Sequence, residues 1–179
     1  MESNIGQKIE EFEKKRAELF EMVESLSVET ISARPIEGKW SILEIVEHLA
    51  NAEADVLGGL PEYDQLAGKR QSLKDGLMYR IVLFVLRVGI PVKAPSKKAL
   101  PEGGRSLAEI RLKWDKSQEW FKDLVADLDE SGLQRAVFYH PVAGPINPEQ
   151  AVVMSIAHID THRRQIAKRL DLIEGERAS

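Results

Sequence analysis

Three histidines are the residues of this sequence whose types and spacing predict chemistry. His158 and His162 stand four residues apart, and within a helix this spacing places two side chains on one face, within reach of a single ion. A helical wheel puts both beside the apolar stripe of their own segment and puts His48 beside the apolar stripe of another. Two neighbouring helices can therefore direct three imidazole nitrogens into one pocket, which would leave an open position on a divalent ion.

Each of these histidines also has a plainer interpretation. Histidines four residues apart can be surface or helix-capping groups, and His48 alone fits a partly buried histidine with its own hydrogen-bond partner. The metal interpretation is favoured because three of the four histidines in the chain fall on comparable helix flanks. The fourth, His140, lies in a proline-rich loop, where we expect a structural role.

The chemistry of such a site follows from its ligands. Three neutral imidazoles would leave the double positive charge of the ion intact, which favours lowering the pKa of a bound water or binding an incoming thiolate. The chain has no cysteine, so any thiol must be a cosubstrate. The sequence HIDTH places Ile159 where the zinc-protease motif H-E-x-x-H requires glutamate, and Asp160 points away from the histidine pair on the wheel. Metalloprotease chemistry is therefore disfavoured.

Three polar residues lie near these histidines in the sequence or on the wheel. Glu44 precedes His48 by one helical turn, but its place in a capping box already explains it. Asp55, two turns after His48, and Gln165, near the histidine pair on the wheel, are candidates for orienting an imidazole or acting as a base. A solvent-facing charge is the default interpretation of Asp55. The sequence identifies no catalytic residue beyond these candidates.

The elements that must hold these residues are four amphipathic segments with apolar residues at three- and four-residue steps. Serine followed three residues later by glutamate forms a capping box at Ser41 and again at Ser106, and Asn147 followed by Pro148 opens the last segment. We expect Gly175 to end that segment. The four predicted helices span about residues 4–26, 41–60, 106–129 and 147–174.

The rest of the chain is less regular. Glycines and prolines interrupt any long element between Gly58 and Gly104, where we expect one shorter helix, Leu73–Val88. Phe138–Asn147 is expected to be a loop, and no strand pattern is visible. The chain is therefore predicted to be all-α, a single domain over residues 1–179. Its architecture would be an up-down four-helix bundle with an irregular, partly helical insertion, about residues 58–104, between bundle helices two and three.

Composition restricts the function classes. A net charge of -4 and a pI of about 5.7 give no general attraction to nucleic acid. The longest apolar stretch, Leu77–Ile90, contains two arginines and is shorter than the about 20 residues that a membrane span needs, so we expect no transmembrane segment. The amino terminus is charged from its second residue and lacks a secretory-signal pattern. Together with the absence of cysteine, this predicts a cytoplasmic protein.

One segment, Lys69–Lys98, is strongly basic within this acidic chain. It contains eight basic residues and one acidic residue, Asp75. Because its part from Leu77 to Lys98 is also apolar, the segment would attract an anionic substrate or rest on a membrane surface. A solvated basic rim around a core helix is the commoner arrangement.

Three stretches of the sequence resemble the DinB-like superfamily of four-helix metalloproteins: WSILEIVEHLANAE (40–53), HPVAGPI (140–146) and HIDTHRRQI (158–166). The resemblance spans nearly the whole chain and is loosest across residues 58–104. It implies one divalent ion, nickel, zinc, iron or manganese, often in a homodimer, and it carries the ligand role onto His48, His158 and His162. Related families include thiol-dependent S-transferases and maleylpyruvate isomerases, so the resemblance does not fix the substrate.

These observations support hypotheses of different classes. The first is a metal-dependent small-molecule enzyme with thiol S-transferase-like or hydrolase-like activity, whose partner would be a small-molecule substrate such as a low-molecular-weight thiol. The alternative is a non-catalytic metal- or ligand-binding bundle with a stress-related role. A third, a membrane-peripheral or partner-binding module, rests on the segment Leu77–Lys98 alone. The histidines by themselves do not decide between catalysis and binding.

Overall fold

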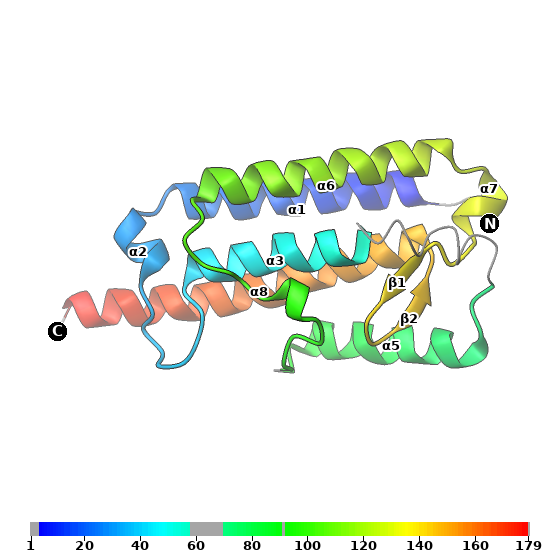
Figure 1. The fold of residues 1–179 in the computed structure, drawn as a ribbon. Coiled ribbons are helices and arrows are strands. Elements are labelled where there is room, and N and C mark those ends of the chain that lie inside the picture. The colour runs from blue at the N-terminus through cyan, green and yellow to red at the C-terminus, as the bar shows by residue number, and fades with distance from the viewer. Residues whose placement is uncertain (1–3, 58–69, 91, 179) are drawn as a thin grey trace.

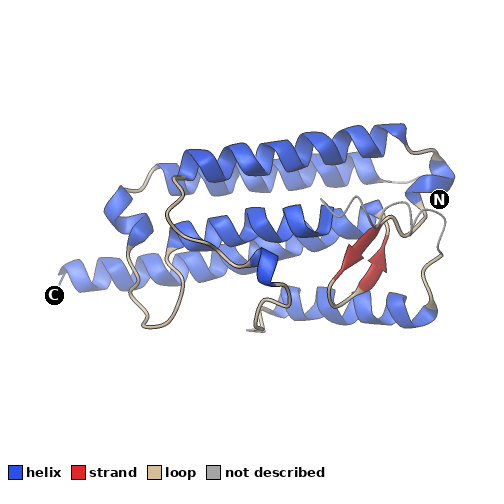
Figure 2. Ribbon diagram, viewed as in Figure 1, coloured by secondary structure: helices blue, strands red, loops and turns tan. Residues whose placement is uncertain are grey.

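A computed structural model describes residues 4–57, 70–90 and 92–178 of the chain. Helices make up most of these residues (Figures 1 and 2), which confirms the predicted all-α class. In chain order the elements are α1 (Ile5–Glu24), α2 (Val28–Ser32), α3 (Ile42–Leu57), α5 (Leu73–Val88), the 3-10 helix η1 (Lys97–Ala99), α6 (Leu107–Asp127), α7 (Glu130–Leu133), β1 (Phe138–His140), β2 (Gly144–Ile146) and α8 (Pro148–Ala178).

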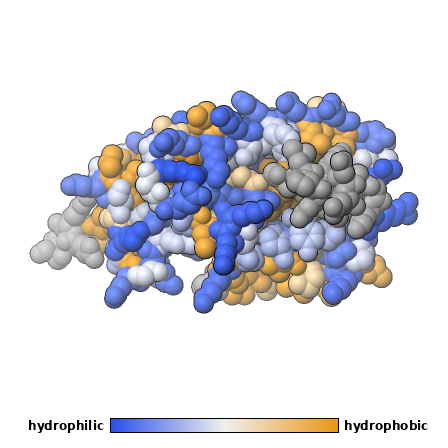
Figure 3. All heavy atoms as spheres, in the orientation of Figure 1, coloured by the Kyte–Doolittle hydropathy of each residue, from blue (hydrophilic) through white to orange (hydrophobic). Residues whose placement is uncertain are grey.

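Four helices, α1, α3, α6 and α8, form the bundle, and α5 packs on the outside of α8 (Figure 1). Successive long helices reverse direction from α1 through α3, α5 and α6 to α8. Because α5 lies between α3 and α6 in the chain and is antiparallel to both, α3 and α6 run in the same direction. The helices α1 and α8 also run in the same direction. Apolar atoms gather along the edge of the molecule that α5 forms (Figure 3).

The predicted caps open three of the bundle helices. At the start of α3, the Glu44 backbone N–H donates to the Ser41 hydroxyl at 3.2 Å, and the Ser41 N–H donates to the Glu44 carboxylate at 2.8 Å. These two bonds satisfy donors that have no partner within the helix. The same reciprocal bonds join Ser106 to Glu109 before α6 and Asn147 to Gln150 before α8.

The bundle core is apolar and contains large aromatic side chains. The Trp114 ring on α6 is almost completely buried, and its centroid lies 6.5 Å from that of Phe12 and 5.7 Å from that of Phe20, both on α1. Ile42, Ile45 and Leu49 of α3 face the same core, together with Ile159 and Ile166 of α8. This packing fixes the relative positions of α3 and α8, which carry the three histidines.

The segment Phe138–Asn147, predicted to be a loop, contains an antiparallel hairpin instead. Phe138 pairs with Ile146 and His140 pairs with Gly144, whose φ of +74° is the left-handed conformation that glycine tolerates best. Phe138 and Ile146 are both buried, so the hairpin covers part of the core. Strands of three residues are too short to show an alternating pattern, which is why the sequence contains no strand signal.

The expected end of the last helix was also wrong, because α8 continues through Gly175 to Ala178. A glycine commonly ends a helix by taking a positive φ, and Gly175 does not take one. Gly175 therefore lowers the stability of the helix by only about 1 kcal/mol, as a glycine within a helix does.

The helix expected at Leu73–Val88 is confirmed as α5, whereas the expected end of the second helix near Leu60 lies outside the described residues. None of the described helices is both long and apolar enough to span a membrane.

Candidate metal centre

The structure brings His48, His158 and His162 together. One ligand nitrogen from each lies within 4.8 Å of the other two. The ring centroid of His48 lies 5.1 Å from that of His158 and 4.9 Å from that of His162. Three ligand nitrogens within a few ångströms of one another can share one ion, whose bonds to imidazole are about 2.0–2.1 Å long. The cluster expected from the sequence is thus present, and its role as a ligand set is the prediction to be tested.

Two helices build this cluster in different ways. His158 and His162 lie one turn apart on α8, and their Nε2 atoms are 3.0 Å from each other. The third ring enters from α3, where His48 is buried close to the contact between α3 and α8. Sequence spacing therefore fixes the histidine pair, whereas only the packing of the bundle brings the third histidine to it.

Hydrogen bonds determine which nitrogen of two rings faces the cluster. His48 Nδ1 lies 2.7 Å from the carbonyl oxygen of Ala99, and because a carbonyl only accepts, Nδ1 carries the proton and donates. His162 Nδ1 likewise donates to Gln165 Oε1 at 3.2 Å. In the neutral rings Nε2 then carries a lone pair and no proton on both histidines. Metal-binding histidines are commonly oriented in this manner by a partner on the other nitrogen.

Burial keeps these imidazoles neutral at pH 7. It lowers the pKa of His48, against the opposing effect of the bond to Ala99, and it lowers the pKa of His162 to about 3. Burial, followed by the positive charges of the neighbouring histidines, lowers the pKa of His158 well below its ordinary value. Neutral imidazole is the form that coordinates a metal, so the protonation state suits the proposed ligands.

The contact between the two histidines of α8 indicates that the three nitrogen donors suit a cation. Two neutral rings that both present an Nε2 lone pair repel each other at 3.0 Å. Without an ion, one ring must carry its proton on Nε2, whereas a shared cation lets both rings present lone pairs. The three donors therefore fit one divalent metal ion, and imidazole suits nickel, zinc and iron alike.

Residues that the sequence did not indicate surround the cluster. The Trp40 ring lies 4.8 Å from the His48 ring, centroid to centroid. Arg169 of α8 is buried and donates to the Trp40 carbonyl at 2.6 Å and to the Gln165 carbonyl at 2.9 Å. Arg169 follows His162 by two helical turns, which is the one signal in the sequence that places it on the same face.

His140 has the structural role that we expected, and it also lies near the cluster. Its Nδ1 accepts the backbone N–H groups of Val142 at 3.1 Å and Ala143 at 3.0 Å, which leaves the proton of the neutral ring on Nε2. Burial lowers the pKa of His140 to about 4, against the opposing charge of Asp55. The positive form of His140 would lower the pKa of His158, so the two rings are electrostatically coupled.

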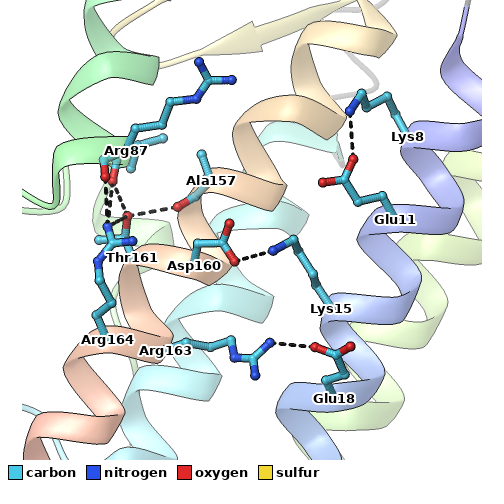
Figure 4. A network of polar contacts seen from close by, with 11 residues as sticks. Lys8, Glu11, Lys15, Glu18, Arg87, Ala157, Asp160, Thr161, Arg163 and Arg164 are labelled. Atoms are coloured by element: carbon cyan, nitrogen blue, oxygen red, sulfur yellow. Dashed lines mark hydrogen bonds and ion pairs between the residues drawn. The ribbon is translucent and has the colours of Figure 1, made fainter.

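The acidic residues near the histidines differ in their roles. Glu44 caps α3 and binds Arg34, so it does not orient His48. The Asp55 carboxylate is largely buried and lies 3.8 Å from the Lys98 ammonium group. Asp55 is therefore not the solvent-facing charge that its sequence position suggests by default. Asp160 accepts a hydrogen bond from Lys15 of α1 at 2.6 Å (Figure 4) and so takes no part in the cluster, as the helical wheel predicted.

The chain matches the model of a known protein family. The family model of the DinB superfamily matches residues 11–166 of the chain, a range that includes all three histidines of the cluster and His140. Neither the curated proteins nor the solved structures give a significant match.

Proposed function

The chain belongs to the DinB superfamily, and from this premise we propose that it is a metal-dependent small-molecule enzyme whose single divalent ion is held by His48, His158 and His162. The observation that carries the proposal is the convergence of three neutral imidazole rings from two helices, those of His48 and His162 buried and that of His158 partly buried. We propose nickel, zinc, iron or manganese as the ion. Imidazole alone does not discriminate among them.

The reaction we propose is thiol S-transfer, with hydrolysis as its variant. A divalent ion bound by neutral ligands supplies a Lewis acid with its full double charge, which suits a thiol or a water as the reacting partner. The chain contains no cysteine, so a thiol must come from a low-molecular-weight cosubstrate. The protein itself orients the imidazoles, through the bonds to Ala99 and Gln165.

We assign separate roles to the polar residues beside the cluster. Gln165 is a positioning residue, because its amide holds His162 and cannot act as a base near pH 7. The neutral His140 ring presents an N–H from Nε2, so its proposed role is to donate a hydrogen bond that orients an anionic or carbonyl group of the substrate. Asp55, whose charge acts on His140, is the proposed base.

The first test is the metal content of protein purified without an affinity tag. About one ion per chain is expected for the wild type, with loss of the ion in His48→Ala and His162→Ala. His140→Ala is the matched control, because it removes an imidazole that is not among the proposed ligands and should keep the ion. Failure of the wild type to bind any divalent ion, even after reconstitution, would remove the basis of the proposal.

The second test is turnover with thiol cosubstrates and small electrophiles. Activity should disappear on chelation, return with one metal, and be absent from His158→Ala. Asp55→Asn should lower kcat by about a hundredfold or more while leaving the metal content unchanged, because general-base catalysis contributes about 10²–10⁴-fold. Turnover that is the same in His158→Ala as in the wild type would contradict the proposal.

One feature favours a non-catalytic alternative, in which the ion serves only to bind α3 to α8. The three histidines join these two helices in the interior of the bundle, as a structural ion would. A cobalt-substituted protein whose spectrum shows no exchangeable water would support this alternative, together with a stress-related binding role.

Two further proposals are a cytoplasmic location and the homodimer that the family resemblance implies. Fractionation and sedimentation equilibrium test them.

A further inference from the structure

Helix α5 has a wide apolar face that no other described element covers. Phe84 is 61% exposed, at the middle of a row of exposed aliphatic side chains. At about 100° per residue, the five side chains of this row fall within an arc of about 80° on the helix surface. We call this row the α5 stripe, and its members are Leu73, Leu77, Ile81, Phe84 and Val88. Ile90 and Val92, just beyond α5, are exposed as well.

Basic side chains lie along both edges of the α5 stripe. The same wheel places Arg80 and Arg87 along one edge and Lys74 along the other. Within the part of the chain that the structure describes, these three side chains form no hydrogen bond or ion pair. The one acidic residue of α5, Asp75, lies on the side of the wheel away from the stripe and caps the helix by binding Ser72. The exposed face of α5 is thus apolar at its centre and only positive at its edges, in a chain whose net charge is -4.

The opposite face of α5 is fixed to α8, so the stripe cannot simply turn inward. The Thr161 hydroxyl donates to the Leu86 carbonyl, and the Arg164 guanidinium donates to the carbonyls of Leu86 and Arg87 at 3.2 Å each (Figure 4). These bonds give further donors to carbonyls in the last turn of α5, where the Leu86 carbonyl also accepts the Gly89 N–H at 3.2 Å. The outward direction of the apolar face is therefore built into the fold.

We propose that α5 docks the protein on the surface of an anionic lipid bilayer. The α5 stripe enters the boundary between headgroups and acyl chains, while Lys74, Arg80 and Arg87 bind lipid phosphates. An apolar stripe bordered by cations matches the two layers of such a surface. A second copy of this chain is a poorer occupant, because two α5 faces brought together would place cations against cations along both edges.

The test is flotation of the full chain with vesicles. We use pure phosphatidylcholine vesicles and vesicles containing about one third phosphatidylserine, whose surface carries the negative charge that attracts basic segments. Binding is expected only to the anionic vesicles and should weaken as salt increases. Phe84→Glu and the pair Arg80→Glu with Arg87→Glu should each lower the partition coefficient by about tenfold or more.

Matched controls come from α6, where Leu112→Ser and Lys116→Glu change an exposed apolar and an exposed basic residue outside α5. They should bind vesicles like the wild type, and circular dichroism should show unchanged folding in all variants. Absence of binding to anionic vesicles, or equal loss in the controls, would overturn the proposal. A concentration-dependent dimer that Phe84→Glu dissociates, without vesicle binding, would assign the stripe to a second copy instead.

Discussion

At the scale of single residues, the metal centre depends on which nitrogen of each histidine carries the proton. Gln165 accepts a hydrogen bond from the Nδ1–H group of His162 and so directs the Nε2 lone pair toward the other two rings. The Ala99 carbonyl has the same effect on His48. A backbone carbonyl cannot be removed by mutation, but the Gln165 side chain can, which makes it the better place to test this orientation.

Gln165→Leu should weaken metal affinity by about ten- to a hundredfold, because the His162 ring loses the acceptor that orients it. Gln165→Glu is the matched control, since a carboxylate accepts the same hydrogen bond and should retain or strengthen binding. Competition with a chromophoric chelator measures both affinities. Equal loss of affinity in the two variants would show that Gln165 acts through packing and not through its acceptor oxygen.

Glu53 makes the folding stability depend on pH. Burial raises its pKa to about 8, against the opposing effects of nearby hydrogen-bond donors and of Arg16, and Gln118 donates a hydrogen bond to its carboxyl group. The native state holds Glu53 protonated at pH values where the unfolded chain ionises it. Its contribution is therefore complete below pH 4.5 and is lost as the pH rises to about 8, by on the order of a few kcal/mol.

The expected result is that Glu53→Gln removes this loss, because glutamine does not ionise. The buried histidines, whose pKa values are lowered, give the opposite slope below pH 6.5, so the measured quantity is the difference between wild type and variant. Urea unfolding from pH 5 to pH 8.5 gives that difference. If the two proteins keep parallel profiles across this range, Glu53 ionises in the native state as it does in water.

The sequence predicts the histidine cluster only in part. The spacing of His158 and His162 fixes their common face, because the geometry of a helix is local. The position of His48 on the flank of its own helix is also local, but its distance to the other two rings depends on how α3 packs against α8. The Ala99 carbonyl comes from a distant part of the chain and reaches His48 only in the fold. Trp40 and Arg169 lie within about two turns of a histidine in the sequence, but the bond that joins them across the bundle depends on packing.

At the scale of elements, α5 ends at a glycine that has a defined task. Gly89 takes a φ of +76°, and its backbone N–H donates to the Val85 carbonyl at 3.0 Å. A Cβ atom on Gly89 would also lie 3.1 Å from the Arg164 guanidinium that holds this end of α5. The left-handed conformation favours glycine here, and any larger residue would also have to displace the Arg164 guanidinium slightly.

The same substitution should therefore have opposite signs at two positions of α5. Gly89→Ala should lower the free energy of unfolding by about 1–2 kcal/mol, because alanine is strained at positive φ. Gly76→Ala should raise it by about 0.5–1 kcal/mol, because this glycine is helical and its nearest neighbour, Gln71, would lie 3.9 Å from the new Cβ. Denaturant unfolding measures both. A loss of stability at Gly76 would show that α5 needs flexibility at that position.

Elements were predictable where the signal is local and strong. The capping boxes at Ser41 and Ser106 start helices as expected, because these bonds join residues three positions apart. The hairpin at Phe138–Ile146 was missed, because its strands are stabilised by pairing and by burial against the core. Gly175 did not end α8, because the conformation of a glycine is set by its surroundings and not by its identity.

At the scale of the whole molecule, the metal centre joins two parts of the chain that are far apart in sequence. α3 belongs to the first half of the bundle, and α8 closes the fold after the α5 insertion and the hairpin. An ion shared by His48 and the histidine pair of α8 would bind the native state and not the unfolded chain. Folding stability and metal concentration should then be linked.

This linkage predicts that a bound divalent ion raises the unfolding temperature. At a free-metal concentration one hundred times Kd, the native state gains about 2.7 kcal/mol, which corresponds to a rise of roughly 5–10 °C for a chain of this size. Differential scanning fluorimetry with added metal and with chelator measures the shift. His158→Ala should show no shift, whereas His140→Ala, which keeps all three ligands, should show the full one. A shift of the same size in both variants would place the stabilising ion elsewhere on the molecule, because only one of them removes a proposed ligand.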